Sequence, residues 1–182
     1  MESKAKISGT NGMDNITVIL DKTPEKYRSN AEQVVADFVE LFRKYTKVTG
    51  IYMKQRNELI KQHKGVVRTA ENWNDFDEYY GCMDKLENDC RKEKMELLGE
   101  YITDNIYVTK FDLYPSRFDY FNTGCRIDFI MKSEKKITLD AIFNGDDYER
   151  HRFILRKQDN NWKIDWFGYS YEEEGYLRKD DL

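Results

Sequence analysis

The chain has 182 residues, of which 40% are hydrophobic, 35% charged and 14% aromatic, and its formal net charge is −4. This length and composition predict one soluble globular domain with a core of its own, and they exclude an intrinsically disordered chain. No run of about 18 apolar residues occurs, so the sequence predicts no membrane span. The N-terminal stretch lacks the basic-then-apolar order of a secretory signal, and we therefore expect a cytoplasmic protein.

The cysteines and the charge distribution limit the kinds of site to expect. Cys82, Cys90 and Cys125 show no C-x-x-C spacing and no ligand-like spacing with the two histidines, so we expect reduced thiols, no metal site and no cofactor. Residues 69–182 hold seventeen Lys/Arg against twenty-six Asp/Glu. This acidic second half argues against nucleic acid as the partner and favours a basic partner, with ordinary solubilising charge as the alternative.

The first part of the chain is expected to be a tail followed by helices. Residues 1–22 have no sustained period and are predicted to be a flexible tail, in which ITVIL could add an edge strand. Thr23 before Pro24 is typical of a helix start, where a hydroxyl caps the helix and proline follows. Three-four apolar spacing predicts an amphipathic helix from Pro24 to about Gly50, a glycine that either ends or bends it.

Two more helical segments follow in the sequence. One is predicted over residues 51–63, with a glycine stop shortly after it. Asp75 and Glu78 resemble a capping box, and the apolar face behind them predicts a long helix that ends near residue 102.

The apolar period changes to two at about residue 104, which predicts strands. Five candidates follow one another with short turns: NIYVTKFDLY, GCRIDFIMK, KITLDAIF, YERHRFILRK and NWKIDWFGYSY. Helices followed by such a meander predict one α+β domain over residues 23–182, with N-terminal helices packed on a long curved antiparallel β-sheet.

Alternation assigns the faces of the predicted strands. The positions expected to face the core are Cys125, Ile127, Phe129, Met131, Ile137, Leu139, Ala141, Phe143, His151, Phe153, Leu155, Trp162, Ile164 and Trp166. A two-residue turn at Asn160-Asn161 would close the last hairpin. That register sets Arg156 opposite Asp165, Ile154 opposite Phe167, Arg152 opposite Tyr169, and Leu155 opposite Trp166.

The predicted outer face is not simply polar. It carries Ile130, Ile142, Ile154 and Phe167 among charged residues, and Tyr169 and Tyr171 continue it toward an acidic run. An apolar patch rimmed by charge is typical of a protein interface. The alternatives are scattered surface residues, or cover by the N-terminal tail.

A helical first half, a curled meander and the closing WKIDWFGY together resemble the nuclear transport factor 2 superfamily over about Pro24 to Tyr176. The resemblance implies a cone-shaped α+β domain whose helices pack into the concave side of a bent sheet. Within the superfamily, the tyrosine-rich acidic ending looks most like the immunity proteins of bacterial polymorphic toxin systems. These bind and neutralise a cognate toxin.

An enzyme on such a cone would need ionisable groups inside it. His151 is the inward candidate, with Tyr27 or Tyr101 conceivably near it, although a lone core histidine is more often a hydrogen-bonded structural residue. Asp128, Asp140 and Asp165 all fall on the outer face, so no carboxylate is placed beside it.

We therefore expect a non-catalytic domain that occludes a protein partner, an immunity protein against a basic toxin domain. Phe167, Tyr169 and Tyr171 would be the anchors and Glu172, Glu173 and Glu174 would steer association, unless the triplet is a solvated terminus. The alternatives are a small-molecule enzyme or carrier, isomerase- or dehydratase-like, that uses the cone interior, and a homodimer through the outer sheet face.

Overall fold

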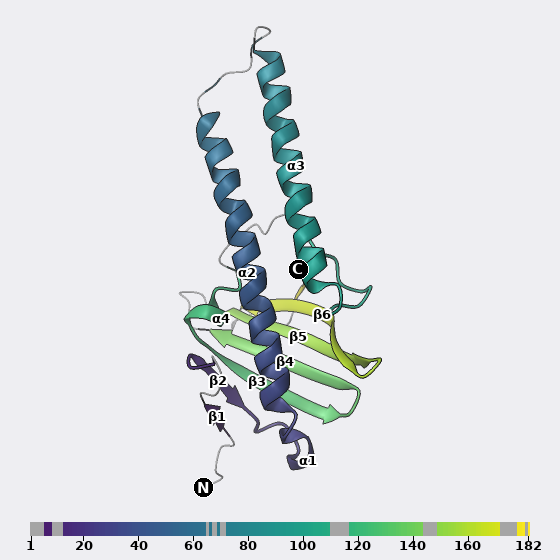
Figure 1. The fold of residues 1–182 in the computed structure, drawn as a ribbon. Coiled ribbons are helices and arrows are strands. Elements are labelled where there is room, and N and C mark those ends of the chain that lie inside the picture. Colours follow the sequence, from purple (N-terminus) through teal and green to yellow (C-terminus); the bar gives the residue numbers. More distant parts are fainter. Residues whose placement is uncertain are drawn as a thin grey trace.

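The computed structural model describes residues 6–8, 13–64, 66, 69, 72–109, 117–143, 149–171, 178–180 and 182. Within them, helices pack on one mostly antiparallel sheet of seven strands, so the predicted α+β class is confirmed (Figure 1). The strands lie side by side in chain order, and among the paired strands only β2 and β3 run parallel.

The helices are α1 (Glu25–Arg28), α2 (Ala31–Gln62), α3 (Trp73–Leu98) and α4 (Tyr120–Thr123). The strands are β1 (Lys6–Ser8), β2 (Ile16–Ile19), β3 (Cys125–Ser133), β4 (Lys136–Phe143), β5 (Glu149–Gln158), β6 (Asn161–Tyr171) and β7 (Arg178–Lys179). The N-terminal half of α2 crosses one face of the sheet, and its C-terminal half continues past the sheet beside α3 (Figure 1). We call the face crossed by α2 the inner face and the opposite one the outer face.

The predicted N-terminal tail is wrong at Lys6–Ser8, which forms β1, and from Met13 onward. Met13, Ile16, Val18 and Leu20 are buried in the core. The strand expected in ITVIL is confirmed as β2, but it is not an edge strand, because it pairs with β1 on one side and with β3 on the other, in the register Ile16↔Cys125. Its apolar residues Ile16 and Val18 bury one face of the strand in the core, and this burial is the reason that the segment joins the sheet.

Thr23 does not cap a helix as predicted. Its hydroxyl donates to the carbonyl of Phe129 at 2.7 Å and accepts from the amide of Met131 at 3.0 Å, so it ties the chain to β3. Only the short α1 follows it, and α2 begins at Ala31.

The predicted helix end at Gly50 is also wrong, because α2 runs through this residue as one helix of 32 residues. A glycine inside a helix costs only about 1 kcal/mol relative to alanine, which the apolar contacts of this helix outweigh. The third helix begins at Trp73, just before the predicted capping box, and ends at Leu98.

The strand predicted over residues 105–114 is wrong where the structure describes it. Residues 106–109 form no strand, and residues 110–114 lie outside the described part of the chain. The amide of Leu182 donates to the carbonyl of Tyr107 at 3.0 Å, and the amide of Thr109 donates to the carbonyl of Leu182. The alternating pattern therefore reflects an extended segment that pairs with one C-terminal residue and not with a full strand.

The turn of the last hairpin lies one residue before the predicted one. Asp159 and Asn160 have φ angles of 48° and 66°, and Gln158 pairs with Asn161. Further along, Leu155 pairs with Ile164 while Ile154 pairs with Trp166, so Asp165 is an extra residue, a β-bulge.

This bulge reverses the faces of Trp166, Phe167 and Tyr169 relative to the prediction. Trp166 shares a row with the outer residue Ile154, and Phe167 pairs with the inner residue Phe153. Phe167 is completely buried. The predicted outward position of Phe167 and inward position of Trp166 are therefore wrong, and Tyr169, opposite His151, lies on the inner face as well.

The other strand faces are as predicted. The buried inner-face residues are Cys125, Ile127, Phe129, Met131, Ile137, Leu139, Ala141, His151, Phe153, Leu155 and Ile164, while Phe143 and Trp162 are partly buried against them. Phe38 and Phe42 of α2 pack on this face, with ring centroids 4.8 and 5.0 Å from that of Phe153. The core thus lies between α2 and the inner face.

The distal parts of α2 (residues 51–62) and α3 (residues 73–89) form an arm that projects beyond the sheet (Figure 1). No residue of either stretch is buried. Near its tip the ring centroids of His63 and Tyr79 lie 4.2 Å apart, while Trp73 and Tyr80 are 50% and 53% exposed. The arm is therefore stabilised by the contacts between α2 and α3.

Candidate functional site

The inner face around His151 is filled with side chains. His151 is completely buried, and its Nδ1 lies 2.8 Å from the hydroxyl of Tyr120, whereas the sequence suggested Tyr27 or Tyr101 as neighbours. The surrounding rings have centroids 5.2 to 6.5 Å from that of His151 and belong to Phe118, Tyr120, Phe143, Phe153 and Phe167. This is the environment of a structural histidine in a packed core.

The described residues contain no group of three or more His, Cys, Asp or Glu side chains that could hold a metal ion. Over the same residues, no helix combines the length and the apolar character that a bilayer span requires. Cys82 is exposed, whereas Cys90 and Cys125 are buried, and burial raises the pKa of the Cys125 thiol to about 12. A thiol with so high a pKa is a poor nucleophile near neutral pH.

The outer face is built from rows of side chains that the strand register aligns. One row, the apolar row, consists of Ile130, Thr138, Ile154 and Trp166, all partly exposed. The next row, the charged row, contains Asp128, Asp140, Arg152 and Gly168. The predicted site residue Ile142 lies beyond the charged row, between Arg126 and Arg150, and does not extend the apolar row.

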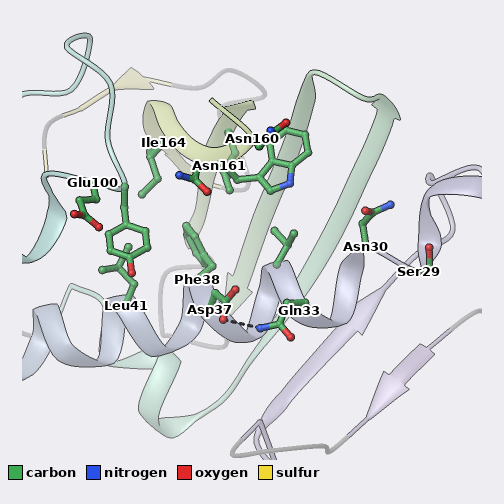
Figure 2. A pocket seen from close by; sticks show the side chains of 14 residues that line it. Ser29, Asn30, Gln33, Asp37, Phe38, Leu41, Glu100, Asn160, Asn161 and Ile164 are labelled. Carbon is green, nitrogen blue, oxygen red and sulfur yellow. Dashed lines mark hydrogen bonds between the residues drawn. The ribbon is translucent and has the colours of Figure 1, made fainter. Parts of the chain in front are cut away.

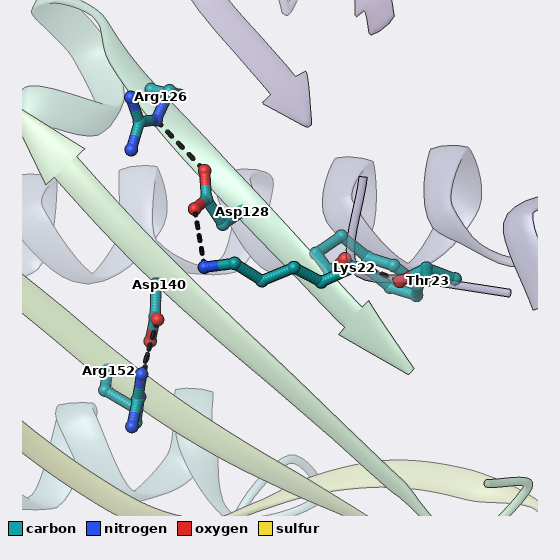
Figure 3. Close-up of polar contacts among 7 residues, drawn as sticks. Lys22, Thr23, Arg126, Asp128, Asp140 and Arg152 are labelled. Carbon is teal, nitrogen blue, oxygen red and sulfur yellow. Dashed lines mark hydrogen bonds and ion pairs between the residues drawn. The ribbon is translucent and has the colours of Figure 1, made fainter. Parts of the chain in front are cut away.

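The charged row is held by ion pairs (Figure 3). Arg152 donates two hydrogen bonds to Asp140, Nε to Oδ1 at 2.5 Å and Nη2 to Oδ2 at 2.6 Å. Asp128, the cross-strand partner of Asp140, has its carboxylate 3.0 Å from Arg126 Nε and 3.7 Å from Lys22 Nζ. Asp140 is 2% exposed, so this pair is fixed in the surface of the sheet.

The outer face carries more positive than negative charge. Its ionisable residues on β3 to β6 are Arg126, Lys132, Lys136, Arg150, Arg152, Arg156 and Lys163 against Asp128, Asp140 and Asp165. The acids each lie beside an arginine, so the excess on this face is basic. The sequence-based expectation of a basic partner counted the whole second half of the chain and does not fit this face.

The bulge residue Asp165 has the only lowered carboxyl pKa resolved among the described residues. Burial raises its pKa, but hydrogen bonds from Arg156, Asn105 Nδ2 (2.8 Å) and Thr103 Oγ1 (3.0 Å) lower it by more. The predicted contact between Arg156 and Asp165 exists, but in a different register. Arg156 pairs across the strands with Lys163 and contacts Asp165 diagonally.

We expect Asp165→Asn to reduce stability most above pH 4. Because the carboxyl pKa is lower in the folded protein than its ordinary value of 3.8, ionisation stabilises the fold above that pH, and the contribution is lost as the pH falls through the folded value. Urea unfolding of both proteins between pH 7 and pH 2.5 measures this difference. The difference in unfolding free energy between wild type and Asp165→Asn should narrow below pH 4. The control Asp104→Asn, at an exposed position, should keep the pH profile of the wild type. A difference for Asp165→Asn that is the same at every pH would contradict the assignment.

The remaining predicted contact residues are distributed as follows. Ile130 and Ile154 lie together in the apolar row, whereas Phe167 is buried and Tyr169 lies on the inner face. The side chain of Tyr171 and residues 172–174 lie outside the described part. Sequence reasoning missed Trp166 as an outer residue; a Cβ on Gly168 would lie 2.3 Å from the Trp166 ring, so the glycine leaves room for the indole.

A separate cleft of about 510 Å³ opens between the N-terminal half of α2, the segment after α3 and the β5–β6 hairpin. Figure 2 places Asn160 and Asn161 of the hairpin across from Gln33 and Asp37 of α2, with Glu100 at one side. His151 does not line it. The cleft is large enough for a small-molecule site, but it does not contain His151, the residue at which the sequence suggested such a site.

Comparison of the chain with protein-family models, with curated proteins and with solved structures found no match in any of the three.

Proposed function

We propose that this is a non-catalytic protein-binding domain that uses the outer face of its sheet. The observation that carries the proposal is the apolar row of Ile130, Ile154 and Trp166, partly exposed and bordered by the charged row. Partly exposed aromatic and aliphatic side chains surrounded by charge are the usual centre of a protein interface. The packed surroundings of His151 support a binding role over a catalytic one.

Charge complementarity sets the chemistry of the partner. The basic excess around the apolar row favours a partner whose contact surface is acidic. The acidic triplet Glu172–Glu174 would favour a basic surface, and it lies outside the described residues. A partner that covers the apolar row would also contact the lysines and arginines of the outer face. We therefore propose that its contact surface is acidic.

The proposed biological role is the one that the sequence suggested, an immunity protein that neutralises a cognate bacterial toxin by occlusion. It rests on the helical first half, the meander and the closing WKIDWFGY, together with an outer face suited to a partner. The product of the neighbouring reading frame is the candidate toxin. Expression of that product alone should stop growth, and co-expression of this chain should restore it; rescue failure would refute the immunity role.

We expect Ile154→Asp to weaken partner binding strongly while the fold persists, because it replaces an apolar contact by a carboxylate that must lose its water in the interface. The fusion-tagged chain and the neighbouring gene product are mixed, and the dissociation constant is measured by calorimetry. Affinity should fall at least about 100-fold, the scale of a hot-spot residue. The matched control Ile51→Asp, on the arm at 49% exposure, should bind as the wild type does.

Two charge reversals in the same assay decide the sign of the partner surface. Lys132→Glu with Lys136→Glu should slow association and flatten its salt dependence if the contact surface is acidic. Reversal of Glu172, Glu173 and Glu174 to lysine should do so if the contact surface is basic. Equal loss with Ile154→Asp and Ile51→Asp would overturn the outer-face site itself.

A further inference from the structure

The cleft between α2 and the β5–β6 hairpin has walls of unequal chemistry. Its floor is apolar, with Phe38 and Leu41 of α2 and Leu155 and Ile164 of the sheet. Its rim is polar and holds Ser29, Asn30, Gln33, Asp37, Glu100, Asn160 and Asn161. A volume of about 510 Å³ with an apolar floor and convergent polar groups is within the range of small-ligand sites.

The rim is rich in acceptors and carries negative charge. Asp37 and Glu100 are its ionisable carboxylates, and no Lys, Arg or His belongs to the lining. Gln33 Nε2 donates to Asp37 Oδ1 at 2.8 Å, which orients the carboxylate and leaves its second oxygen as an acceptor (Figure 2). An anionic ligand would meet two like charges here, and no residue of the lining carries a positive charge.

The rings in the lining add a second feature that suits a cation. Trp162 is half-buried and Tyr101 is 44% exposed, and both line the cleft. Ammonium and guanidinium groups are attracted to the faces of such rings. Lys157 Nζ already lies 6.0 Å from the centroid of the Trp162 ring, although Lys157 does not line the cleft.

We propose that this cleft binds an aliphatic chain that carries amine or guanidinium groups. The chain would lie on the floor of Phe38, Leu155 and Ile164, and its cationic groups would donate to the Asp37 and Glu100 carboxylates, with the Trp162 ring as a further contact in the same lining. Such charge-assisted hydrogen bonds are about twice as strong as neutral ones. The site is independent of the protein-binding function, because it opens on the inner side of the sheet and shares no residue with the apolar row.

The test is calorimetric titration of the full chain at low salt with two cationic probes, spermidine and a blocked Gly-Arg-Gly-Arg-Gly peptide. Spermidine represents a free polyamine, and the peptide represents basic side chains of a protein. Asp37→Asn combined with Glu100→Gln should weaken the binding probe at least about tenfold. The control pair Glu58→Gln with Asp84→Asn removes the same charge from exposed positions on the arm and should change affinity by less than about twofold.

The outcomes separate the possibilities. Spermidine binding alone assigns a free polyamine, peptide binding alone assigns a protein side chain, and Trp162→Leu should weaken either by a smaller factor than the double variant. Maltose and citrate are titrated as neutral and anionic probes. Failure of both cations to bind, equal weakening in the two double variants, or tighter binding of maltose or citrate would overturn the proposal, and thermal melts of each variant establish that it is folded.

Discussion

Phe167→Ala is expected to lower the free energy of unfolding by about 3–5 kcal/mol, the usual cost of removing a buried phenylalanine. The side chain is completely buried, and its ring is stacked on that of Phe153 with centroids 4.8 Å apart. The ring of Phe118 lies at 5.6 Å, and Arg117 Cζ lies 4.7 Å from the Phe167 centroid. Because a domain of this size is stable by about 5–15 kcal/mol, the variant should lose a large part of its stability.

The comparison with Trp166→Ala tests the bulge at Asp165 directly. In the structure Trp166 is partly exposed on the outer face, so its truncation should cost only about 1–2 kcal/mol. If β6 alternated without a bulge, Trp166 would be the core residue and Phe167 the surface one. Chemical denaturation of both variants measures the difference, and a larger cost for Trp166→Ala would refute the register.

Asp140→Asn is expected to cost about 3 kcal/mol, because it leaves the guanidinium of Arg152 in the sheet without its counter-charge. Asp140 is 2% exposed and accepts both Arg152 hydrogen bonds, which also raise the pKa of Arg152. This cost lies at the low end of the range for buried ion pairs, because the Arg152 side chain is 28% exposed.

A second substitution separates the ion pair from the packing of the two side chains. Asp140→Asn with Arg152→Met removes both charges, and we expect it to recover much of the stability that Asp140→Asn alone loses. Urea unfolding of the four proteins gives the coupling between the two residues. Additive losses in the double variant would show that the pair does not act as a unit.

Periodicity predicted the fold class and most of the core because burial follows it closely. The inner positions of β3, β4 and β5 alternate without interruption, and each was assigned to the correct face. Two signals failed for physical reasons. Gly50 has no Cβ contact within 4 Å and lies in a helix stabilised by its neighbours, so its low propensity did not end the helix. Residues 13–20 are too few for periodicity to distinguish a strand from a tail.

The candidate site was predicted less well, since one inserted residue decides it. Asp165 falls on an outward position of the regular alternation, and nothing in DWFG marks it as an inserted residue. The assignment of Phe167 and Tyr169 to the outer face followed from regular alternation, and the bulge reverses both. Ile130 and Ile154 were assigned correctly because they lie on strands where the alternation holds. The cleft could not be predicted, because its walls come from three segments far apart in the chain.

The arm implies that stability is divided unevenly along the chain. Residues 51–62 and 73–89 contain no buried side chain, so we expect their backbone hydrogen bonds to break without disturbing the aromatic cluster beneath α2. Local opening there should therefore cost far less free energy than global unfolding. We expect the sheet and the core beneath α2 to be the most stable part of the chain. The backbone amides of the arm should be the first to exchange with solvent in a hydrogen-exchange experiment.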